Sequence, residues 1–138
     1  MNKSEILAKL SGLNLNSEKF AVISGASLVV QGVIEQTGDI DLTCDKNFYK
    51  TINWPTKIGA LGAEIKYFDV FEISPNLYEE GAKTTNINGF KFLNLQDVLK
   101  VKKLLNRPKD QQVINKLEQM LKEEKWFTKL QITKMDMI

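Results

Sequence analysis

The order of apolar and polar residues changes character several times along the chain, and each change marks an expected element. Short apolar or alternating runs predict strands, whereas apolar residues spaced three and four apart predict helices. Strands are expected over 19–24, 39–44 and 63–74, with a hairpin over 84–93. Helices are expected over 4–12, 26–35, 47–54, 95–105 and 108–124. This order predicts an α/β or α+β fold, in which a small mixed sheet is flanked by helices and further helices follow at the C-terminal end.

The chain is expected to form a single domain over residues 1–138. It has no internal repeat, no low-complexity tract and no linker rich in proline and glycine. Within the domain we expect a core over about 20–93 and a helical part over 94–138. Asn88-Gly89 is typical of a tight type I′ turn within the hairpin, and Pro108 is typical of a helix start.

Two residue types that carry much of enzyme chemistry are scarce in this chain. It has no histidine, which excludes a Ser-His-Asp triad and a histidine-rich zinc site, and its single cysteine, Cys44, excludes an internal disulfide. Cys44 stands in an apolar strand pattern, which favours a small buried hydrophobe over a reactive thiol. Carboxylates remain as candidate metal ligands, and these favour a hard ion such as Mg²⁺ or Mn²⁺.

Charge and hydropathy bear on location and partners. No apolar run reaches the roughly 18 residues that a membrane span needs, and residues 1–13 are too amphipathic and too acidic for a signal peptide. We therefore expect a cytoplasmic protein without a membrane partner. Residues 1–90 contain 8 basic and 11 acidic side chains, net −3, whereas residues 91–138 contain 11 basic and 6 acidic, net +5. The basic excess indicates either solvated helices or a surface that faces an anionic ligand.

The candidate chemistry lies in the alternating segment 39–44. Side chains at i and i+2 of a strand project from one face, so Asp39 and Asp41 would present two carboxylates about 6–7 Å apart. A cation would relieve the repulsion between them, and paired carboxylates can hold metal ions as phosphoryl-transfer enzymes do. The competing interpretation is a solvated strand end, which is common for two aspartates at this spacing.

A third carboxylate is expected from the strand predicted over 63–74. Asp69 stands in its apolar centre, where a buried and unpaired charge is costly, and it is the preferred third ligand. Glu72 would lie on the opposite face from Asp69 and is the weaker candidate. Upstream, Ser24-Gly25 separates a strand from a helix, and such a turn either lets a phosphate approach the backbone or simply joins the two elements.

These motifs together resemble the nucleotidyltransferase superfamily with the DNA polymerase β-like fold. In that family a small glycine turn opens a helix, an acid-hydrophobic-acid-hydrophobic strand follows, and a third acid lies on a later strand. Ser24-Gly25, the pair Asp39 and Asp41, and Asp69 stand at these places. The turn reads Ser-Gly-Ala-Ser where the family has Gly-Gly or Gly-Ser, and Ser27 is the candidate for the usual serine, one position late.

The C-terminal part extends the resemblance, which spans about residues 20–118. Residues 88–118 look like the corresponding part of small bacterial members related to the abortive-infection and toxin–antitoxin transferases. The matching places are held by Lys102, Arg107, Lys109 and Asp110. Lys102 is interpreted as a point charge for a triphosphate or as a helix-surface lysine, and Arg107 with Asp110 as a pair that fixes the corner between two helices.

The resemblance implies a metal-dependent transfer of a nucleoside monophosphate to a hydroxyl group, with release of pyrophosphate. Asp39, Asp41 and Asp69 would hold Mg²⁺ or Mn²⁺, and Asp69 would also act as the general base. Ser24, Gly25, Ser27 and Lys102 would contact the nucleoside triphosphate. The hydroxyl acceptor, a small molecule, RNA or protein, is left open, as is a homodimer or a partner protein that completes the acceptor site.

Two other functions compete with the transferase. One is a catalytically inactive partner or antitoxin-like binding module that keeps the fold, which the altered turn favours. The other is a nucleic-acid binder that works through the basic C-terminal half. Its lysines are dispersed with few aromatic residues between them, which ranks this function last.

Overall fold

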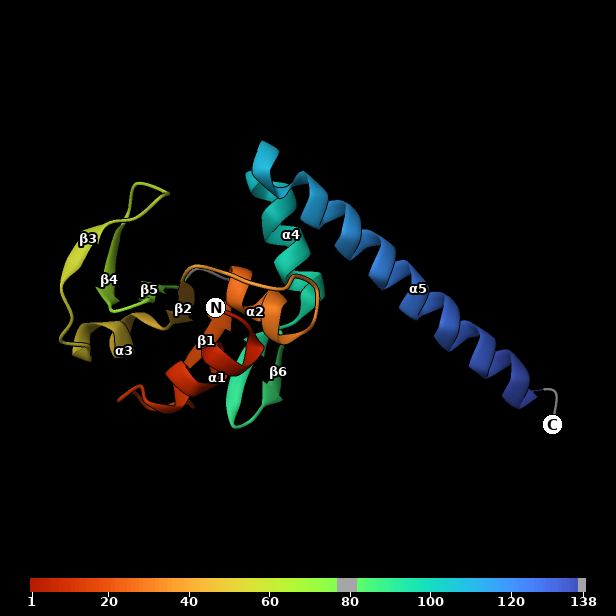
Figure 1. Ribbon diagram of the computed structural model, residues 1–138, viewed down its shortest axis with the longest axis horizontal. Helices are drawn as coiled ribbons and strands as arrows, with labels where there is room; N and C mark the ends of the chain where they lie inside the picture. The colour runs from red at the N-terminus through yellow and green to blue at the C-terminus, as the bar shows by residue number, and fades with distance from the viewer. Residues whose placement is uncertain (77–81, 137–138) are drawn as a thin grey trace. The chain divides into compact units, whose positions relative to one another are not determined.

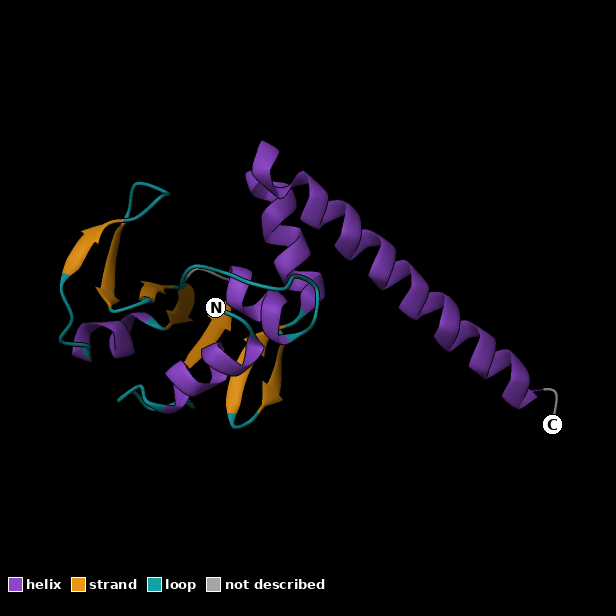
Figure 2. Ribbon diagram, viewed as in Figure 1, coloured by secondary structure: helices purple, strands orange, loops and turns teal. Residues whose placement is uncertain are grey.

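The computed structural model describes residues 1–76 and 82–136, with side chains described as far as Lys125. The chain divides into two compact units, residues 1–98 and 99–138, which are described separately below. The division falls inside a helix, because the second unit begins at Leu99, five residues after the expected start of the helical part at residue 94. The elements are labelled in Figure 1, and Figure 2 separates helices from strands.

A mixed seven-stranded sheet forms the centre of the first unit in the described part of the chain. The strand order is β3-β4-β5-β2-β1-β7-β6, with β1–β7 and β2–β5 parallel and the other neighbours antiparallel. The strands are β1 Phe20–Ile23, β2 Ile40–Cys44, β3 Thr56–Ile58, β4 Glu64–Phe68, β5 Phe71–Pro75, β6 Thr84–Ile87 and β7 Phe90–Leu93. The helices before residue 95 are α1 Lys3–Ser11, α2 Ser24–Val30 and α3 Lys46–Thr51. The expected fold class, a mixed sheet flanked by helices with further helices at the C-terminal end, is confirmed.

One face of the sheet carries the hydrophobic core. In β2 the residues Ile40, Leu42 and Cys44 are buried and belong to one cluster with Ile6 of α1 and Val29 of α2. The alternating β2 residues Asp41 and Thr43 therefore face the other side, away from this core. Cys44 is the expected buried hydrophobe, and burial raises the pKa of its thiol to about 11.

Two hairpins show where the sequence signals were sufficient and where they were not. Asn88 and Gly89 have positive φ angles of 54° and 85°, which confirms a two-residue turn of the I′ type between β6 and β7. The single strand expected over 63–74 is wrong, because β4 and β5 form an antiparallel hairpin that turns at Asp69-Val70. Asp69 adopts a φ of 53°, which aspartate tolerates better than most residues, so the turn needs no glycine. The short edge strand β3 was not expected.

The second unit contains most of α4 Leu95–Leu105, a 3₁₀ turn at Pro108–Asp110, and α5 Gln111–Asp136. Pro108 opens the turn before α5, as its preference for a helix start predicts. α5 has 26 residues. Figure 1 shows it as one continuous helix. None of the described helices is long and apolar enough to cross a membrane.

Candidate metal-binding site

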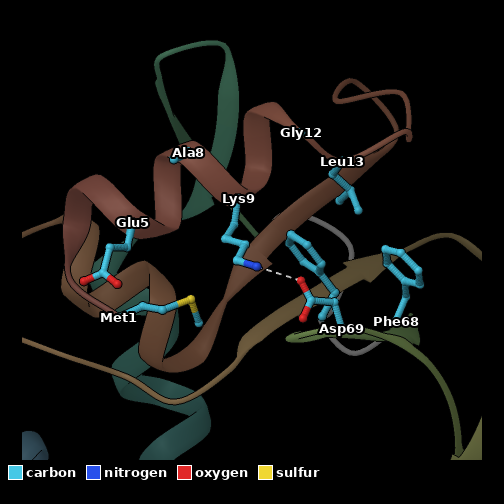
Figure 3. A pocket seen from close by; sticks show the side chains of 9 residues that line it. Met1, Glu5, Ala8, Lys9, Gly12, Leu13, Phe68 and Asp69 are labelled. Atoms are coloured by element: carbon cyan, nitrogen blue, oxygen red, sulfur yellow. Dashed lines mark hydrogen bonds and ion pairs between the residues drawn. The ribbon is translucent and has the colours of Figure 1, made fainter.

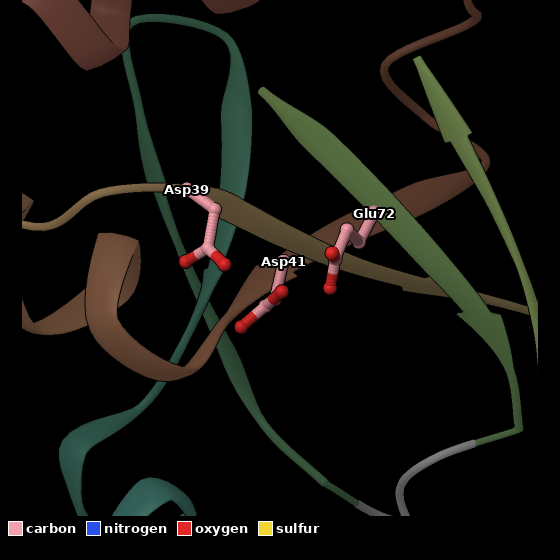
Figure 4. Close-up of side chains that lie close together, drawn as sticks. All are labelled: Asp39, Asp41 and Glu72. Carbon is pink, nitrogen blue, oxygen red and sulfur yellow. The ribbon is translucent and has the colours of Figure 1, made fainter. Parts of the chain in front are cut away.

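Three carboxylates converge on the face of the sheet that points away from the core. β2 and β5 run parallel, and their register places Asp41 directly opposite Glu72. Asp39 lies one residue before β2 and two before Asp41. One carboxylate oxygen from each of Asp39, Asp41 and Glu72 lies within 4.8 Å of the others, as the close-up in Figure 4 illustrates. Asp39 is exposed, whereas Asp41 and Glu72 are half-buried, so the cluster is open to a ligand from solvent.

The start of β2 is held by the hairpin that supplies Glu72. The Ile40 backbone N–H donates to the Val70 carbonyl oxygen at 2.8 Å, next to the turn between β4 and β5. The five paired positions from Ile40–Phe71 to Cys44–Pro75 continue this contact. The separation between the two aspartates and Glu72 is therefore set by backbone pairing rather than by a flexible loop.

Asp69 does not join this cluster, and the expectation that it stands at the centre of a strand is wrong. It lies in the turn after β4, where its carboxylate accepts from Lys9 Nζ of α1 at 2.8 Å. Figure 3 shows this ion pair. Both residues line a cavity of about 470 Å³. The cavity is lined by α1 and the core residue Phe71, so it belongs to the helix-covered side of the sheet.

Glu72 supplies the third carboxylate of the cluster in place of Asp69, because the chain turns at Asp69-Val70 between β4 and β5. In one continuous strand, positions 69 and 72 would face opposite ways, which made Glu72 the weaker candidate. The hairpin ends that continuity and begins a new strand at Phe71, whose register with β2 decides which face Glu72 occupies. Phe71 and Ile73 point into the core, so Glu72 between them points out beside Asp41.

The strand-to-helix turn lies next to the acids. Ile23, the last residue of β1, pairs with Asp41, and Ser24 follows it as the first residue of α2. Ser24 has a φ of 55°, which is uncommon for a residue with a side chain and is found at many functional turns. A Cβ on Gly25 would lie 2.7 Å from Thr37 Oγ1, so glycine is needed here for the approach of the loop that leads to Asp39.

Ser27 is removed from the candidate phosphate contacts. Its side chain is 0% exposed, and its hydroxyl donates to the Leu93 carbonyl oxygen at 2.8 Å. The same hydroxyl accepts from Gln31 Nε2 at 2.8 Å. The Ser27 hydroxyl therefore ties α2 to β7 and is not exposed to a phosphate in solvent.

Lys102 also forms a contact within the fold, an ion pair with Asp110. In the second unit, its ammonium lies 3.1 Å from Asp110 Oδ1, and Arg107 Nε donates to Asp110 Oδ2 at 2.6 Å. Burial alone raises the pKa of Asp110, but the hydrogen bonds from Arg107 and Lys102 outweigh it and hold the pKa below its usual value. The expected pairing of Arg107 with Asp110 is confirmed, and Lys102 shares it rather than presenting an exposed point charge.

A lysine that the sequence pattern did not single out faces the cluster. Lys57 of β3 donates from Nζ to Glu72 Oε1 at 2.6 Å and lies 5.0 Å from the centre of the Tyr67 ring. The hydrogen bond to Glu72 is the main cause that raises the pKa of Lys57, and the charge of Asp39 adds to it. No spacing rule connects position 57 with position 72, because their proximity depends on the unexpected hairpin.

The donor set fits a hard divalent cation. Three carboxylates supply only oxygen ligands, and Mg²⁺ is commonly bound by one or two carboxylates together with substrate phosphates and water. Asp39 is exposed, so such a substrate can approach it from solvent. Comparison with protein-family models, with curated proteins and with solved structures finds no match to this chain.

Proposed function

We propose that the protein is a metal-dependent nucleotidyltransferase, which moves a nucleoside monophosphate from a nucleoside triphosphate to a hydroxyl acceptor. The observation that carries the proposal is the convergence of Asp39 and Asp41, at the start of β2, with Glu72 of the adjacent parallel strand β5. A turn with an unusual backbone conformation at Ser24 begins beside Asp41, where phosphate oxygens could meet backbone N–H groups. A cytoplasmic location, where nucleoside triphosphates are abundant, belongs to the same proposal.

Each residue then has a role that follows from its place. Asp39 and Asp41 would hold Mg²⁺ or Mn²⁺, and a bound ion would supply charge stabilisation at the triphosphate. Glu72 would complete the site and accept the proton of the attacking hydroxyl at a carboxylate oxygen. The hydroxyl oxygen bonds to the α-phosphorus as the bond to pyrophosphate breaks, so the nucleotide is transferred and pyrophosphate leaves. The acceptor, whether a small molecule, RNA or protein, is left open.

The test separates Glu72 from Asp69, two acids of the same hairpin. Thermal stability is measured with each of the four ribonucleoside triphosphates, with and without Mg²⁺ or Mn²⁺. At a hundredfold excess over the dissociation constant, binding stabilises the folded protein by about 2.7 kcal/mol. We expect Glu72→Gln to lose this metal-dependent stabilisation and Asp69→Asn to keep it. Asparagine tolerates the positive φ at position 69, so Asp69→Asn is a matched control.

The opposite results have definite meanings. Stabilisation that is lost in Asp69→Asn and kept in Glu72→Gln would return the third-ligand role to Asp69. Asp39→Ala/Asp41→Ala, in which both candidate ligands of β2 are removed, must lose the metal-dependent shift. The transferase would be rejected if no nucleotide gave such a shift in the wild-type protein.

One observation favours a second candidate, a non-catalytic binding module that keeps this fold. Lys57 forms an ion pair with Glu72, so a positive side chain of the protein already neutralises part of the charge of the cluster. A protein that had lost metal binding would need such a neutralising contact. The nucleotide and metal titration distinguishes the two candidates, because the binding module shows no metal-dependent stabilisation by any nucleoside triphosphate.

A further inference from the structure

Lys57 reaches the acidic cluster from the edge of the sheet. It lies on β3, the outermost strand, and pairs across the sheet with Ile65 of β4. Tyr67, two residues further along β4, pairs with Glu72, which in turn pairs with Asp41. Cross-strand partners and residues two apart share a face, so Lys57, Tyr67, Glu72 and Asp41 all lie on the face away from the core.

The contact with Glu72 involves a group that the metal site also needs. Glu72 Oε1 accepts from the Lys57 ammonium at 2.6 Å, a short charge-assisted hydrogen bond. An ammonium and a divalent cation both require the negative charge of this carboxylate. Binding of the cation therefore weakens the ion pair between Lys57 and Glu72. The ion pair in turn lowers the affinity of the site for the cation.

The Lys57 side chain is suited to a second position. It is 44% exposed, its stem is flexible, and the Tyr67 ring 5.0 Å from the ammonium is its other described contact. An ammonium is a compact charge with three donors, a common partner of phosphate oxygens. Because Lys57 Nζ lies 2.6 Å from a carboxylate that would hold the metal ion, Lys57 is placed to contact phosphates that the same ion would bind.

We propose that Lys57 is a phosphate-binding residue of this site, which a metal–nucleotide complex displaces from Glu72 and which then contacts the phosphates of the nucleotide. The proposal rests on the proposed function, because it requires the Asp39–Asp41–Glu72 cluster to bind metal. Lys57 would then have opposite effects on the binding of two ligands. It would compete with the metal ion when the ion binds alone, and it would assist binding of the nucleoside triphosphate.

The first measurement is binding of Mn²⁺ alone, by titration calorimetry, to the wild type and Lys57→Met. Methionine keeps much of the length of the stem and removes the charge. We expect Lys57→Met to bind Mn²⁺ about two- to fivefold more tightly, the scale of one exposed ion pair. The matched control is Lys9→Met, which removes an equally exposed lysine from the carboxylate of Asp69, outside the cluster. Lys9→Met should leave the Mn²⁺ affinity at the wild-type value.

The second measurement is binding of a nucleoside triphosphate at saturating Mg²⁺. Lys57→Met should bind it about fivefold or more weakly, because a charge-assisted contact to phosphate is lost. Lys9→Met should bind it as the wild type does. Lys57→Gln, which remains polar at the exposed edge strand, repeats both measurements if methionine there causes association.

The outcomes separate this proposal from the proposed function. In one outcome, Glu72→Gln weakens Mn²⁺ binding, but Lys57→Met has the same Mn²⁺ and triphosphate affinities as Lys9→Met. The metal site then stands and the role of Lys57 is overturned. Weaker Mn²⁺ binding by Lys57→Met, or unchanged triphosphate binding, also overturns it. If neither the wild type nor Lys57→Met binds Mn²⁺, the proposed function fails and the proposal fails with it.

Discussion

Individual polar residues in this protein divide into those that face the acidic cluster and those that fix the fold, and Ser27 belongs to the second group. Its hydroxyl is buried, donates to the Leu93 carbonyl and accepts from Gln31. Gln31 also donates to the Leu93 carbonyl at 2.9 Å, so the three groups form one closed network. Such a network stabilises the position of α2 against β7, whatever is bound near Ser24.

Removing the Ser27 hydroxyl should therefore lower stability rather than ligand affinity. We expect Ser27→Ala to reduce the free energy of unfolding by about 1–3 kcal/mol, because a buried hydrogen bond is lost and its partners are left partly unpaired. Ser11→Ala removes an exposed serine that bonds the Leu7 carbonyl, and it should change stability by less than about 0.5 kcal/mol. Urea denaturation measures both. A stable Ser27→Ala protein with weakened nucleotide binding would instead return Ser27 to the phosphate contacts.

At the same scale, the sequence predicted the part of the site that depends on local spacing. Asp39 and Asp41 are two residues apart around a strand start, and period-two alternation is enough to place both on one face. The third carboxylate depends on how β5 pairs with β2, 31 residues away along the chain. Local pattern carries no information about that pairing, so it favours Asp69 over Glu72 and gives no reason to select Lys57.

At the scale of elements, the junction between β1 and α2 is closely packed against the loop that leads to Asp39. The loop that leads to Asp39 passes so close to Gly25 that a Cβ there would lie 2.7 Å from Thr37 Oγ1 and 3.4 Å from Thr37 Cβ. The turn and the segment that leads into β2 are thus fitted to each other. The glycine turn was recognised from sequence as a place of close approach, but the group that approaches is a threonine of this chain.

This fit predicts that Gly25→Ala acts through Thr37. The new methyl group displaces the threonine, and we expect a loss of about 1–3 kcal/mol in stability together with weaker Mn²⁺ binding. In a Thr37→Ala background the clash is absent, and alanine in α2 should be neutral or stabilising by up to about 1 kcal/mol. A double-mutant cycle of the free energy of unfolding measures the coupling.

The control for the cycle lies in the same loop. A Cβ on Gly38 would meet nothing within 4 Å, so Gly38→Ala should leave Mn²⁺ binding close to that of the wild type. If Gly25→Ala is equally harmful with and without Thr37, the close approach is not the reason for the glycine.

Elements also show why the fold class was easier to predict than its strand boundaries. Apolar periodicity located β1, β2, α4 and the β6–β7 hairpin, each of which has a strong local signal such as Asn88-Gly89. The β4–β5 hairpin has no glycine or proline at its turn, and the residues on both sides continue the same apolar character. Only tertiary pairing shows that Phe68 ends one strand and Phe71 begins the next.

For the whole molecule, the division into two compact units separates the acidic cluster from the buried charges of the helical part. Asp39, Asp41 and Glu72 belong to residues 1–98, whereas Lys102, Arg107 and Asp110 belong to residues 99–138. Asp110 is 4% exposed and bonds both cations, so removing it would leave Lys102 buried without its partner. Changes to the two clusters should consequently have different effects, one on ligand binding and the other on stability.

Asp110→Asn should destabilise the protein and leave Mn²⁺ binding intact. We expect a loss of about 2–3 kcal/mol at pH 7 in urea denaturation followed by circular dichroism, because a buried ion pair is broken at one partner. The pKa of Asp110 is lowered by folding, so its contribution is present above the unfolded value, about 3.9, and is lost as the pH falls through the lowered pKa. The difference in the free energy of unfolding between the wild type and Asp110→Asn should therefore shrink below about pH 4.

The control is Glu118→Gln, which breaks the exposed pair with Lys103 and should cost less than about 0.5 kcal/mol of stability. A difference that stayed constant down to pH 2, or a loss of Mn²⁺ binding in Asp110→Asn, would show that Asp110 acts in some way other than by holding these two cations.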